Sequence, residues 1–442
     1  MELIIKKATN LTDMIQVFRL DGLKGEAFDR FYYKDTIANR TGDINNSPVE
    51  DLLEHCQIPS SRNAHLFMGH KGCGKSTELY QFKRKLQETG QPSSIVDVAV
   101  STDVWNITHW DIMLLITEGL CQIALDADID IPSKLTQNIL DYLNKDIVEE
   151  ETFTDSTSVS AQAGARVKAL TLFFAEFKAK FKANSETRKV TSEKMQKRAA
   201  EWISYIIEIT NHITAGLDGK QPVLIFENLD KLPDPEKAIH ILENPFLSEL
   251  PFPIVYTFPI SLSYHVRFPS LSHNYGSCIL PMIKVNNLDN SENPEGIHIL
   301  QALVTLRAEE TLFANDVLVH LIKQTGGVLR DLFKCIVWAA SRARRRIATQ
   351  PVDANPPHHV EMEDAQVALA ELRKDLSRQI RVDDYDMLIR LHKDEKYRLD
   401  IEDEEWLLNK LLASVVLEYS NGDRWHNLHP MVLDFLTRRD KL

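Results

Sequence analysis

The pattern of apolar and polar residues along the chain predicts strands that alternate with amphipathic helices. Short, continuous apolar runs occur at 66–68, 94–100, 222–226, 253–257 and 278–285. Between them, apolar residues recur every three or four positions, most clearly at 78–86, 107–126, 133–145 and 166–182. Continuous apolar strands separated by helices are typical of a parallel sheet that is covered on both faces. We therefore expect an α/β fold in which helices sandwich a parallel sheet.

The second half of the chain shows helical spacing almost throughout. It extends over 294–349 and 361–378, and three helical segments after residue 384 precede a hairpin with the turn Asn421-Gly422. Three helices and a hairpin resemble a winged helix. The expected division is listed in chain order: an N-terminal helical segment at 1–60, a sheet-containing core at 61–287 with a basic insert at about 150–200, a helical lid at 288–380 and a winged-helix-like domain at 381–442.

One stretch carries the strongest chemical signal, and it reads Gly69-His70-Lys71-Gly72-Cys73-Gly74-Lys75-Ser76-Thr77. It fits the pattern Gly-x-x-x-x-Gly-Lys-Ser/Thr, and it lies between an apolar strand and a helix, as a phosphate-binding loop requires. Glycines let successive backbone N–H groups point at phosphate oxygens, and the helix N-terminus adds partial positive charge. In such a loop Lys75 would reach the β- and γ-phosphates, and the Ser76 hydroxyl would ligate Mg²⁺. The sequence therefore predicts a nucleoside triphosphate site.

Three later segments supply polar groups that suit such a site. The apolar run 222–226 ends in an acid, Glu227, which is the place for a carboxylate that holds magnesium. Thr257 ends the next apolar run, where a hydroxyl could position the γ-phosphate. Arg330 follows a Gly-Gly pair in the first turn of a helix. Because the helix dipole disfavours a cation there, this position indicates an anionic partner for Arg330.

The segments 69–79, 223–231 and 326–331 together resemble the bacterial AAA+ and STAND-type P-loop ATPases. They are similar to the branch shared with origin-recognition-like initiators, whose ATPase core carries a helical lid and a winged helix. The resemblance covers about 25–442. It implies ATP rather than GTP, a homo-oligomer, and an N-terminal segment that packs near the adenine.

The resemblance also assigns roles to single residues. Lys75 and Ser76 would bind the nucleotide and Mg²⁺. Glu227 aligns with the metal-directing acid, Thr257 with the first sensor residue, and Arg330 with the lid arginine that contacts the γ-phosphate.

The chain departs from the family pattern in two ways. The family has Asp followed by an acid, whereas this chain has Glu227-Asn228, and an amide cannot act as a base. Asp230 is the candidate replacement, although it lies one residue too far along a strand. Hydrolysis is therefore expected to be slow, which favours a nucleotide-gated switch. No arginine finger is assignable; Arg267 is a candidate, but an ordinary surface arginine is favoured.

The composition of the chain limits the compartment and the class of protein to which it can belong. The net charge is −13, which does not favour a nucleic-acid coat protein, and neither a secretory signal nor an apolar run long enough to span a membrane is evident. Five scattered cysteines indicate thiols in a reducing cytoplasm. Cys73 lies in the phosphate loop beside a helix N-terminus, an environment that lowers a thiol pKa. Thiol-sensitive nucleotide binding is one interpretation of Cys73, and a small residue that fills the loop is the favoured one.

Basic residues are concentrated in two places of this acidic chain. Residues 161–200 contain ten Lys or Arg against three Glu, and a cluster at the end of one helix contains Arg342, Arg344, Arg345 and Arg346. Either region could bind nucleic acid or an acidic partner, or could be a solvated helix face or a favourable helix C-terminus. From residue 383 onward the chain has nine basic and fourteen acidic residues. This negative charge disfavours binding of duplex DNA by the C-terminal domain and favours a role for it as a protein-interaction module.

Two functions are compatible with these features. The first is an ATP-driven oligomeric switch or motor that controls a partner effector, a role that the resemblance extends to bacterial phage defence. The second is a DNA-binding initiator or clamp-loader-like ATPase. A small-molecule kinase that uses the same loop is disfavoured by the lid and the C-terminal module.

Overall fold

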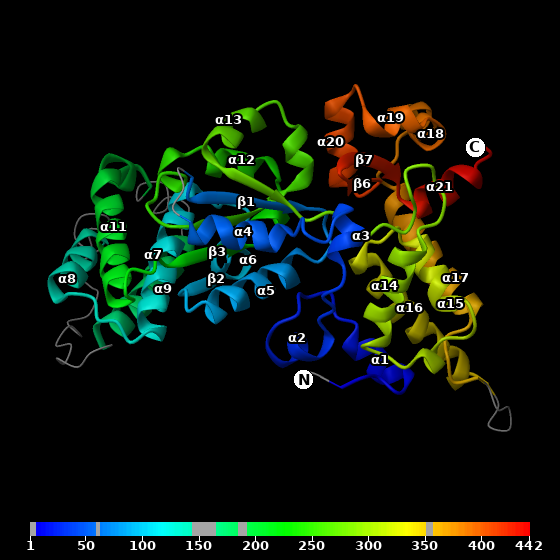
Figure 1. Cartoon of the computed structure of the whole chain (residues 1–442), viewed down its shortest axis with the longest axis horizontal. Coiled ribbons are helices and arrows are strands. Elements are labelled where there is room, and N and C mark those ends of the chain that lie inside the picture. The colour runs from blue at the N-terminus through cyan, green and yellow to red at the C-terminus, as the bar shows by residue number, and fades with distance from the viewer. Residues whose placement is uncertain (1–5, 59–61, 144–164, 184–191, 351–356) are drawn as a thin grey trace.

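The protein is described by a computed structural model, which covers residues 6–58, 62–143, 165–183, 192–350 and 357–442 (Figure 1). At its centre is a five-stranded parallel sheet with the order β2-β3-β4-β1-β5. Its strands are β1 (Ala64–Gly69), β2 (Ser93–Asp97), β3 (Val223–Glu227), β4 (Ile254–Pro259) and β5 (Gly276–Ile279). The helices before and between them are α4 (Pro48–Gln57), α5 (Lys75–Glu88), α6 (Val98–Ser101), α7 (His109–Asp126), α8 (Ser133–Asp141), α9 (Ala165–Ala183), α11 (Ala199–Gly216), α12 (Glu236–Leu242) and α13 (Phe268–Asn274).

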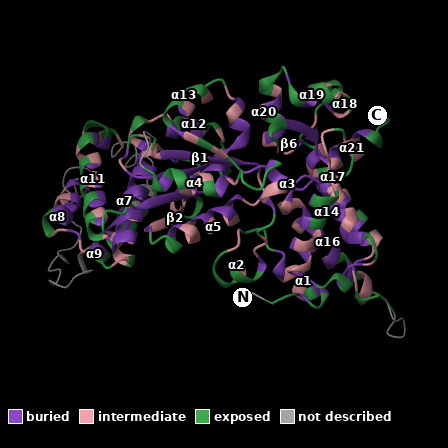
Figure 2. Cartoon of the chain, in the orientation of Figure 1, coloured by how far each residue is buried: buried purple, intermediate pink, exposed green. Residues whose placement is uncertain are grey.

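Adjacent residues of one strand belong to two different hydrophobic cores. On β3, Leu224 and Phe226 pack in the core that contains α7 and α11, whereas Val223 and Ile225 pack in the core that contains α4 and α5. Both faces of the three inner strands, β1, β3 and β4, are therefore buried, whereas the edge strands β2 and β5 are partly exposed; Figure 2 shows β1 in the buried colour and β2 in the intermediate one. This is why the strands are continuous apolar runs rather than alternating ones. The expected sandwich of helices around a parallel sheet is confirmed.

The rest of the chain is mainly helical and lies to one side of the sheet (Figure 1). The N-terminal helices are α1 (Leu11–Val17), α2 (Gly25–Phe31) and α3 (Ile37–Thr41). The lid contains α14 (Pro294–Thr305), α15 (Val317–Gln324), α16 (Leu329–Ala348) and α17 (Met362–Ser377). The C-terminal part contains α18 (Tyr385–Lys393), α19 (Glu395–Leu399), α20 (Glu404–Leu412), the hairpin β6 (Val416–Asn421) and β7 (Asp423–Leu428), and α21 (Pro430–Thr437).

One hydrophobic core joins these three parts. It contains apolar residues of α1, of the lid helices and of the C-terminal helices. The N-terminal segment therefore packs against the lid as well as against the sheet. The domain boundaries and the winged-helix assignment stay predictions.

Three expectations about single elements need correction. The strand expected at 94–100 ends at Asp97, because the Asp97 side chain accepts hydrogen bonds from the backbone N–H groups of Ala99 and Val100 and starts α6. The last strand is 276–279 rather than 278–285, because its pairing with β1 ends at Ile279. A final helix, α21, follows the hairpin and was not expected. The insert expected at about 150–200 lies partly outside the described residues.

The C-terminal hairpin is bonded to the phosphate-binding loop. His70 Nε2 accepts a hydrogen bond from the backbone N–H of Glu418 on β6, at 2.8 Å. Burial lowers the pKa of His70 to about 4, so the ring is a neutral acceptor at neutral pH. The Glu418 carboxylate in turn accepts a hydrogen bond from the Tyr264 hydroxyl at 2.7 Å and lies 3.5 Å from His426 Nε2. These contacts join the loop to the hairpin and to the segment after β4.

Gly327, between α15 and α16, is required by its surroundings. It has φ +81°, and a Cβ added to it would lie 1.9 Å from the carbonyl oxygen of Ile283. Gly327→Ala should therefore lower the free energy of unfolding by about 2–4 kcal/mol, combining left-handed strain with a backbone clash. Gly219→Ala is the matched control, since Gly219 has φ +87° with nothing within 4 Å, and it should lose only about 1–2 kcal/mol. Equal losses in denaturant titrations of the two variants would contradict this account.

Candidate functional site

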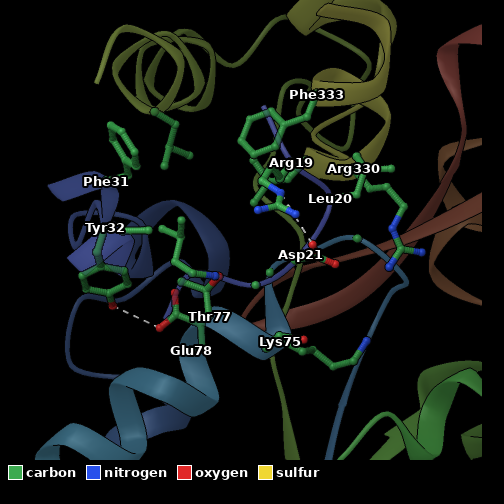
Figure 3. Close-up of a pocket in the computed structure, with 18 of the residues that line it drawn as sticks. Arg19, Leu20, Asp21, Phe31, Tyr32, Lys75, Thr77, Glu78, Arg330 and Phe333 are labelled. Atoms are coloured by element: carbon green, nitrogen blue, oxygen red, sulfur yellow. Dashed lines mark hydrogen bonds and ion pairs between the residues drawn. The ribbon is translucent and has the colours of Figure 1, made fainter. Parts of the chain in front are cut away.

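A cavity of about 470 Å³ lies where the sheet, the N-terminal segment and the lid meet (Figure 3). Each part contributes a defined group of lining residues. The loop and the start of α5 contribute Lys71, Gly72 and Gly74–Glu78; the strand ends contribute Asp230, Lys231 and Thr257; the N-terminal segment contributes residues 16–17, 19–24, 26–27, 31–33, Thr36 and Arg40; the lid contributes Leu303, Arg307, Leu329, Arg330 and Phe333. In Figure 3, Phe31 lies at the upper left, Phe333 in the upper middle and Lys75 in the lower half of the view.

Glycines in the loop let the lid approach it closely. Gly72 and Gly74 have φ +84° and +108°, values that favour glycine. A Cβ at Gly72 would lie 2.5 Å from Cβ of Arg330, and the Arg330 N–H donates to the Gly72 carbonyl at 3.3 Å. The first turn of α16 is therefore in direct contact with the phosphate-binding loop.

The Lys75 ammonium is buried and fully engaged by the protein. It donates hydrogen bonds to the carbonyl oxygens of Gly69 and His70 at 2.7 and 2.9 Å, and it forms an ion pair with Asp230 at 2.9 Å. Burial lowers the pKa of Lys75, but the Asp230 carboxylate more than offsets this, so the pKa lies above its usual value. Likewise burial raises the pKa of Asp230, and Lys75 reverses the shift, leaving that pKa low. Both groups are therefore charged at neutral pH.

Two further cations lie at the same end of the cavity. Lys71 and Arg330 line it, and neither forms an ion pair among the described residues. Burial lowers the pKa of Lys71, with Asp230 opposing this and Arg330 adding to it. Lys71, Lys75 and Arg330 thus lie close enough to repel one another beside a loop whose geometry suits phosphate, and only Lys75 pairs with Asp230 among the described residues. This end of the cavity is electrostatically matched to a multiply charged anion.

Asp230 reaches Lys75 because the chain turns after β3. Asn228 has φ +70°, a conformation that Asn tolerates, and the chain then enters a short 3₁₀ turn, η2 (Leu229–Lys231). The Leu229 N–H donates to Thr257 Oγ1 at 3.0 Å, which fixes this turn against β4. The sequence argument placed Asp230 too far along a strand; that argument was wrong, since the strand ends at Glu227.

Glu227 does not line the cavity. Its carboxylate is 5% exposed, and its Oε2 lies 3.2 Å from Nζ of Lys24 in the N-terminal segment. Asn228 also points away from the loop, since its Nδ2 donates to Asp97 Oδ1 on β2 at 2.8 Å. Of the expected site residues after β3, the structure therefore brings Asp230 and Thr257 to the cavity and holds Glu227 beside it.

The N-terminal segment crosses the start of α5. The Leu23 N–H donates to Thr77 Oγ1 at 3.1 Å, and the Gly25 N–H donates to the Tyr80 hydroxyl at 2.9 Å. A Cβ at Gly22 would lie 2.5 Å from Cβ of Ser76, so only glycine fits. Sequence reasoning missed these contacts because more than fifty residues separate the two segments and no motif marks residues 22–25.

Arg40 is a second contribution that the sequence did not reveal. It is 2% exposed, lines the cavity, and donates from Nη2 to the carbonyl of Cys73 at 2.9 Å. It also donates to the Pro281 carbonyl, so it ties the loop to the chain after β5. The Cys73 side chain is itself buried, which agrees with a small residue that fills the loop.

Other candidate residues have partners elsewhere. Arg267 pairs with Glu243, outside the cavity. Arg346 and Arg342 lie 3.0 and 3.7 Å from Asp364 on α17, whereas the two arginines between them, Arg344 and Arg345, are exposed. All five cysteines are free thiols. The basic region 161–200 lies partly outside the described residues, and the side chains of 178–183 lie outside them as well.

Two general features are absent from the part of the chain that the structure describes. No three or more His, Cys, Asp or Glu side chains gather there as they would around a metal ion. None of its helices combines the length and the apolar character that crossing a bilayer requires.

Comparison with known proteins gives matches among solved structures only. No family model and no curated protein matches the sequence. An ORC1 protein of Aeropyrum pernix in complex with DNA is 13% identical, with 90% of this chain and 93% of that chain covered and a TM-score of 0.37. A Walker-type ATPase of Pyrococcus abyssi is 13% identical, with 96% and 99% covered and a TM-score of 0.43. Both are of the kind that the sequence predicts, but at these TM-scores the P-loop fold rests on the chain's own sheet and loop.

The Asn228–Asp97 contact generates a pH-dependent prediction. Asn228→Asp replaces the amide donor with a second carboxylate and should lower the free energy of unfolding by about 1–3 kcal/mol near neutral pH. Repulsion raises the pKa of one carboxyl group in the folded state above its unfolded value. That group then binds a proton more readily when folded, so the loss should shrink as the pH falls toward about 4.

Asn228→Ala serves as the control for this measurement. It removes the same hydrogen bond without adding charge, so its loss relative to the natural protein should change with pH much less than that of Asn228→Asp. Denaturant unfolding of both variants across this pH range checks the expectation, and parallel pH profiles for the two would contradict it.

Proposed function

We propose that this chain binds ATP with Mg²⁺ in the cavity at the phosphate loop, hydrolyses it slowly, and acts as a nucleotide-gated oligomeric switch. The observation that carries the proposal is the cluster of Lys71, Lys75 and Arg330 at the loop, in which Lys75 alone has an ion-pair partner among the described residues. The phosphates of a nucleotide supply the negative charge that this cluster lacks, through charge-assisted hydrogen bonds. The aromatic and aliphatic residues at the other end of the cavity suit a base.

The residues beside the loop fit a magnesium ion. Mg²⁺ on a nucleotide commonly takes one or two protein oxygens and completes its shell with phosphate oxygens and water. The Ser76 hydroxyl and the Glu227 carboxylate are the oxygens that would hold it. Glu227 already holds a cation in this structure, the Lys24 ammonium, so its environment suits positive charge. Bound there, the ion would neutralise charge that develops on the phosphates.

Four residues would act on the bound nucleotide. In this proposal Glu227 directs the metal, Thr257 and Arg330 contact the γ-phosphate, and Asp230 orients the attacking water. Asp230 is an unusual base because its carboxylate is paired with Lys75, which lowers its pKa and its basicity. This supports slow turnover, in which the bound nucleotide persists long enough to signal.

Contacts around the loop support a switch. The lid touches the loop through Arg330 and Gly72, and the C-terminal hairpin touches it through His70 and Glu418. Displacement of the loop by a nucleotide would therefore reach both parts. We infer that these parts report the nucleotide state to a neighbouring subunit and to an effector protein in the cytoplasm, in the setting of phage defence.

Lys75→Ala should reduce ATP affinity by about 10- to 100-fold, because it removes a charge-assisted hydrogen bond to phosphate. It also leaves Asp230 buried without a partner, at a cost of about 3–5 kcal/mol of stability. The double variant Lys75→Ala/Asp230→Asn separates the two effects, since it should recover stability without recovering affinity. Lys83→Ala, on the same helix but outside the cavity, is the control.

Calorimetry measures ATP binding by these variants. Native mass spectrometry with and without ATP measures assembly, and an oligomer that ATP leaves unchanged counts against the switch.

A DNA-binding initiator is the second candidate, favoured by the exposed Arg344 and Arg345 at the end of α16. If the chain binds duplex DNA through them, the affinity should fall steeply as the salt concentration rises. In a plot of the logarithm of the binding constant against the logarithm of the salt concentration, the slope should be shallower by about two for the double alanine variant. Fluorescence anisotropy with a labelled duplex checks this. Binding that the double variant leaves unchanged would exclude these arginines.

A further inference from the structure

The apolar end of the cavity contains a buried cation without an acidic partner. Arg307 follows α14, is 4% exposed and lines the cavity. Among the described residues its guanidinium forms one hydrogen bond, from Nη1 to the carbonyl of Leu303 at 2.6 Å, and no ion pair. Its Cζ lies 5.5 Å from the ring centroid of Phe31 and 5.1 Å from that of Phe333.

A guanidinium in this setting is costly to bury unless its remaining donors find acceptors. Burial lowers the pKa of Arg307 to about 10, so it is still charged at neutral pH. The two phenyl rings offset part of the desolvation through cation–π contact, but rings accept no conventional hydrogen bonds. A guanidinium has five N–H donors, and the structure uses one of them. The others have no acceptor among the described residues and are open to one in the cavity.

The position of Arg307 indicates which part of a nucleotide would supply that acceptor. The first turn of α16 touches the loop at Arg330, and Phe333 lies about one helical turn farther along. Arg307 contacts Phe333 and, from the N-terminal segment, Phe31. It therefore lies beyond the cations that surround the loop, among the apolar residues where a nucleotide held by its phosphates would place its base.

We propose that Arg307 is the specificity-determining residue of this site and donates a hydrogen bond to an acceptor on the nucleobase. The inference rests on the proposed function, because it assumes that the phosphates lie in the loop. A planar, permanently charged donor between two aromatic rings suits the edge of a purine, whose ring nitrogens are acceptors. A site in which a buried donor forms a hydrogen bond to the ligand discriminates strongly against ligands that lack the matching acceptor.

Arg307→Met should weaken ATP binding by about 10- to 100-fold and leave the affinity for inorganic tripolyphosphate unchanged. Tripolyphosphate fills the loop without a base, so it isolates the phosphate end of the site. The ATP affinity of Arg307→Lys should lie between that of the natural protein and that of Arg307→Met, because lysine keeps the charge but lacks the planar guanidinium. Calorimetry with both ligands on the full chain measures the ratio of the two affinities, and thermal unfolding reports whether each variant is folded.

Three analogues identify the atom. The analogues 1-deaza-, 3-deaza- and 7-deaza-ATP each lack one ring nitrogen. The analogue that lacks the nitrogen contacted by Arg307 should bind Arg307→Met and the natural protein equally well. Arg398→Met is the matched control: Arg398 is also buried and bonded to backbone carbonyls, but it lies on α19 away from the cavity. It should lower thermal stability without changing the ratio of ATP to tripolyphosphate affinity.

The outcomes separate this inference from the function on which it rests. If the natural protein binds neither ATP nor tripolyphosphate, the proposed function fails. If it binds both and Arg307→Met weakens both equally, or neither, the assignment of Arg307 to the base is overturned. Full sensitivity of all three deaza analogues to Arg307→Met would likewise overturn a ring-nitrogen contact.

Discussion

A buried ion pair, Lys75–Asp230, holds the centre of this structure together. Lys75 begins the helix that follows the phosphate loop, and Asp230 follows the third strand, so their pairing fixes the loop against the sheet. Neither charge could be buried alone, because the desolvation of an unpaired ion costs several kcal/mol. In the proposed function, a phosphate would have to compete with Asp230 for the same ammonium. One electrostatic contact would then couple ligand binding to the internal order of the site.

Around this pair the loop is held from three sides. Residues 22–25 cross the start of α5, the first turn of α16 approaches Gly72, and β6 donates a backbone hydrogen bond to His70. Each contact comes from a different part of the chain and ends within a few residues of Lys75. A rearrangement of the loop would therefore be felt by the N-terminal segment, the lid and the C-terminal hairpin together, which is the physical basis for proposing a switch rather than a rapid hydrolase.

The two ends of the cavity have different chemistry. The loop end contains several cations, while at the other end buried Arg307 lies against the rings of Phe31 and Phe333, with Arg19 beside Phe333 in Figure 3. Asn228 is consistent with this emphasis on binding, since its amide is used to hold Asp97 and no carboxylate replaces it. Asp230, the carboxylate that pairs with Lys75, is neutralised by it.

The sequence by itself determined the sheet, its flanking helices and the phosphate loop, because periodicity and the spacing of Gly69, Gly74 and Lys75 are local properties of the chain. It also indicated that Thr257 and Arg330 belong to the site. Only the tertiary structure decided that Asp230 reaches Lys75, that Glu227 is held by Lys24, and that Arg307 lies buried at the apolar end. These contacts join segments up to about two hundred residues apart or depend on one left-handed residue, so they follow from packing rather than from any local pattern.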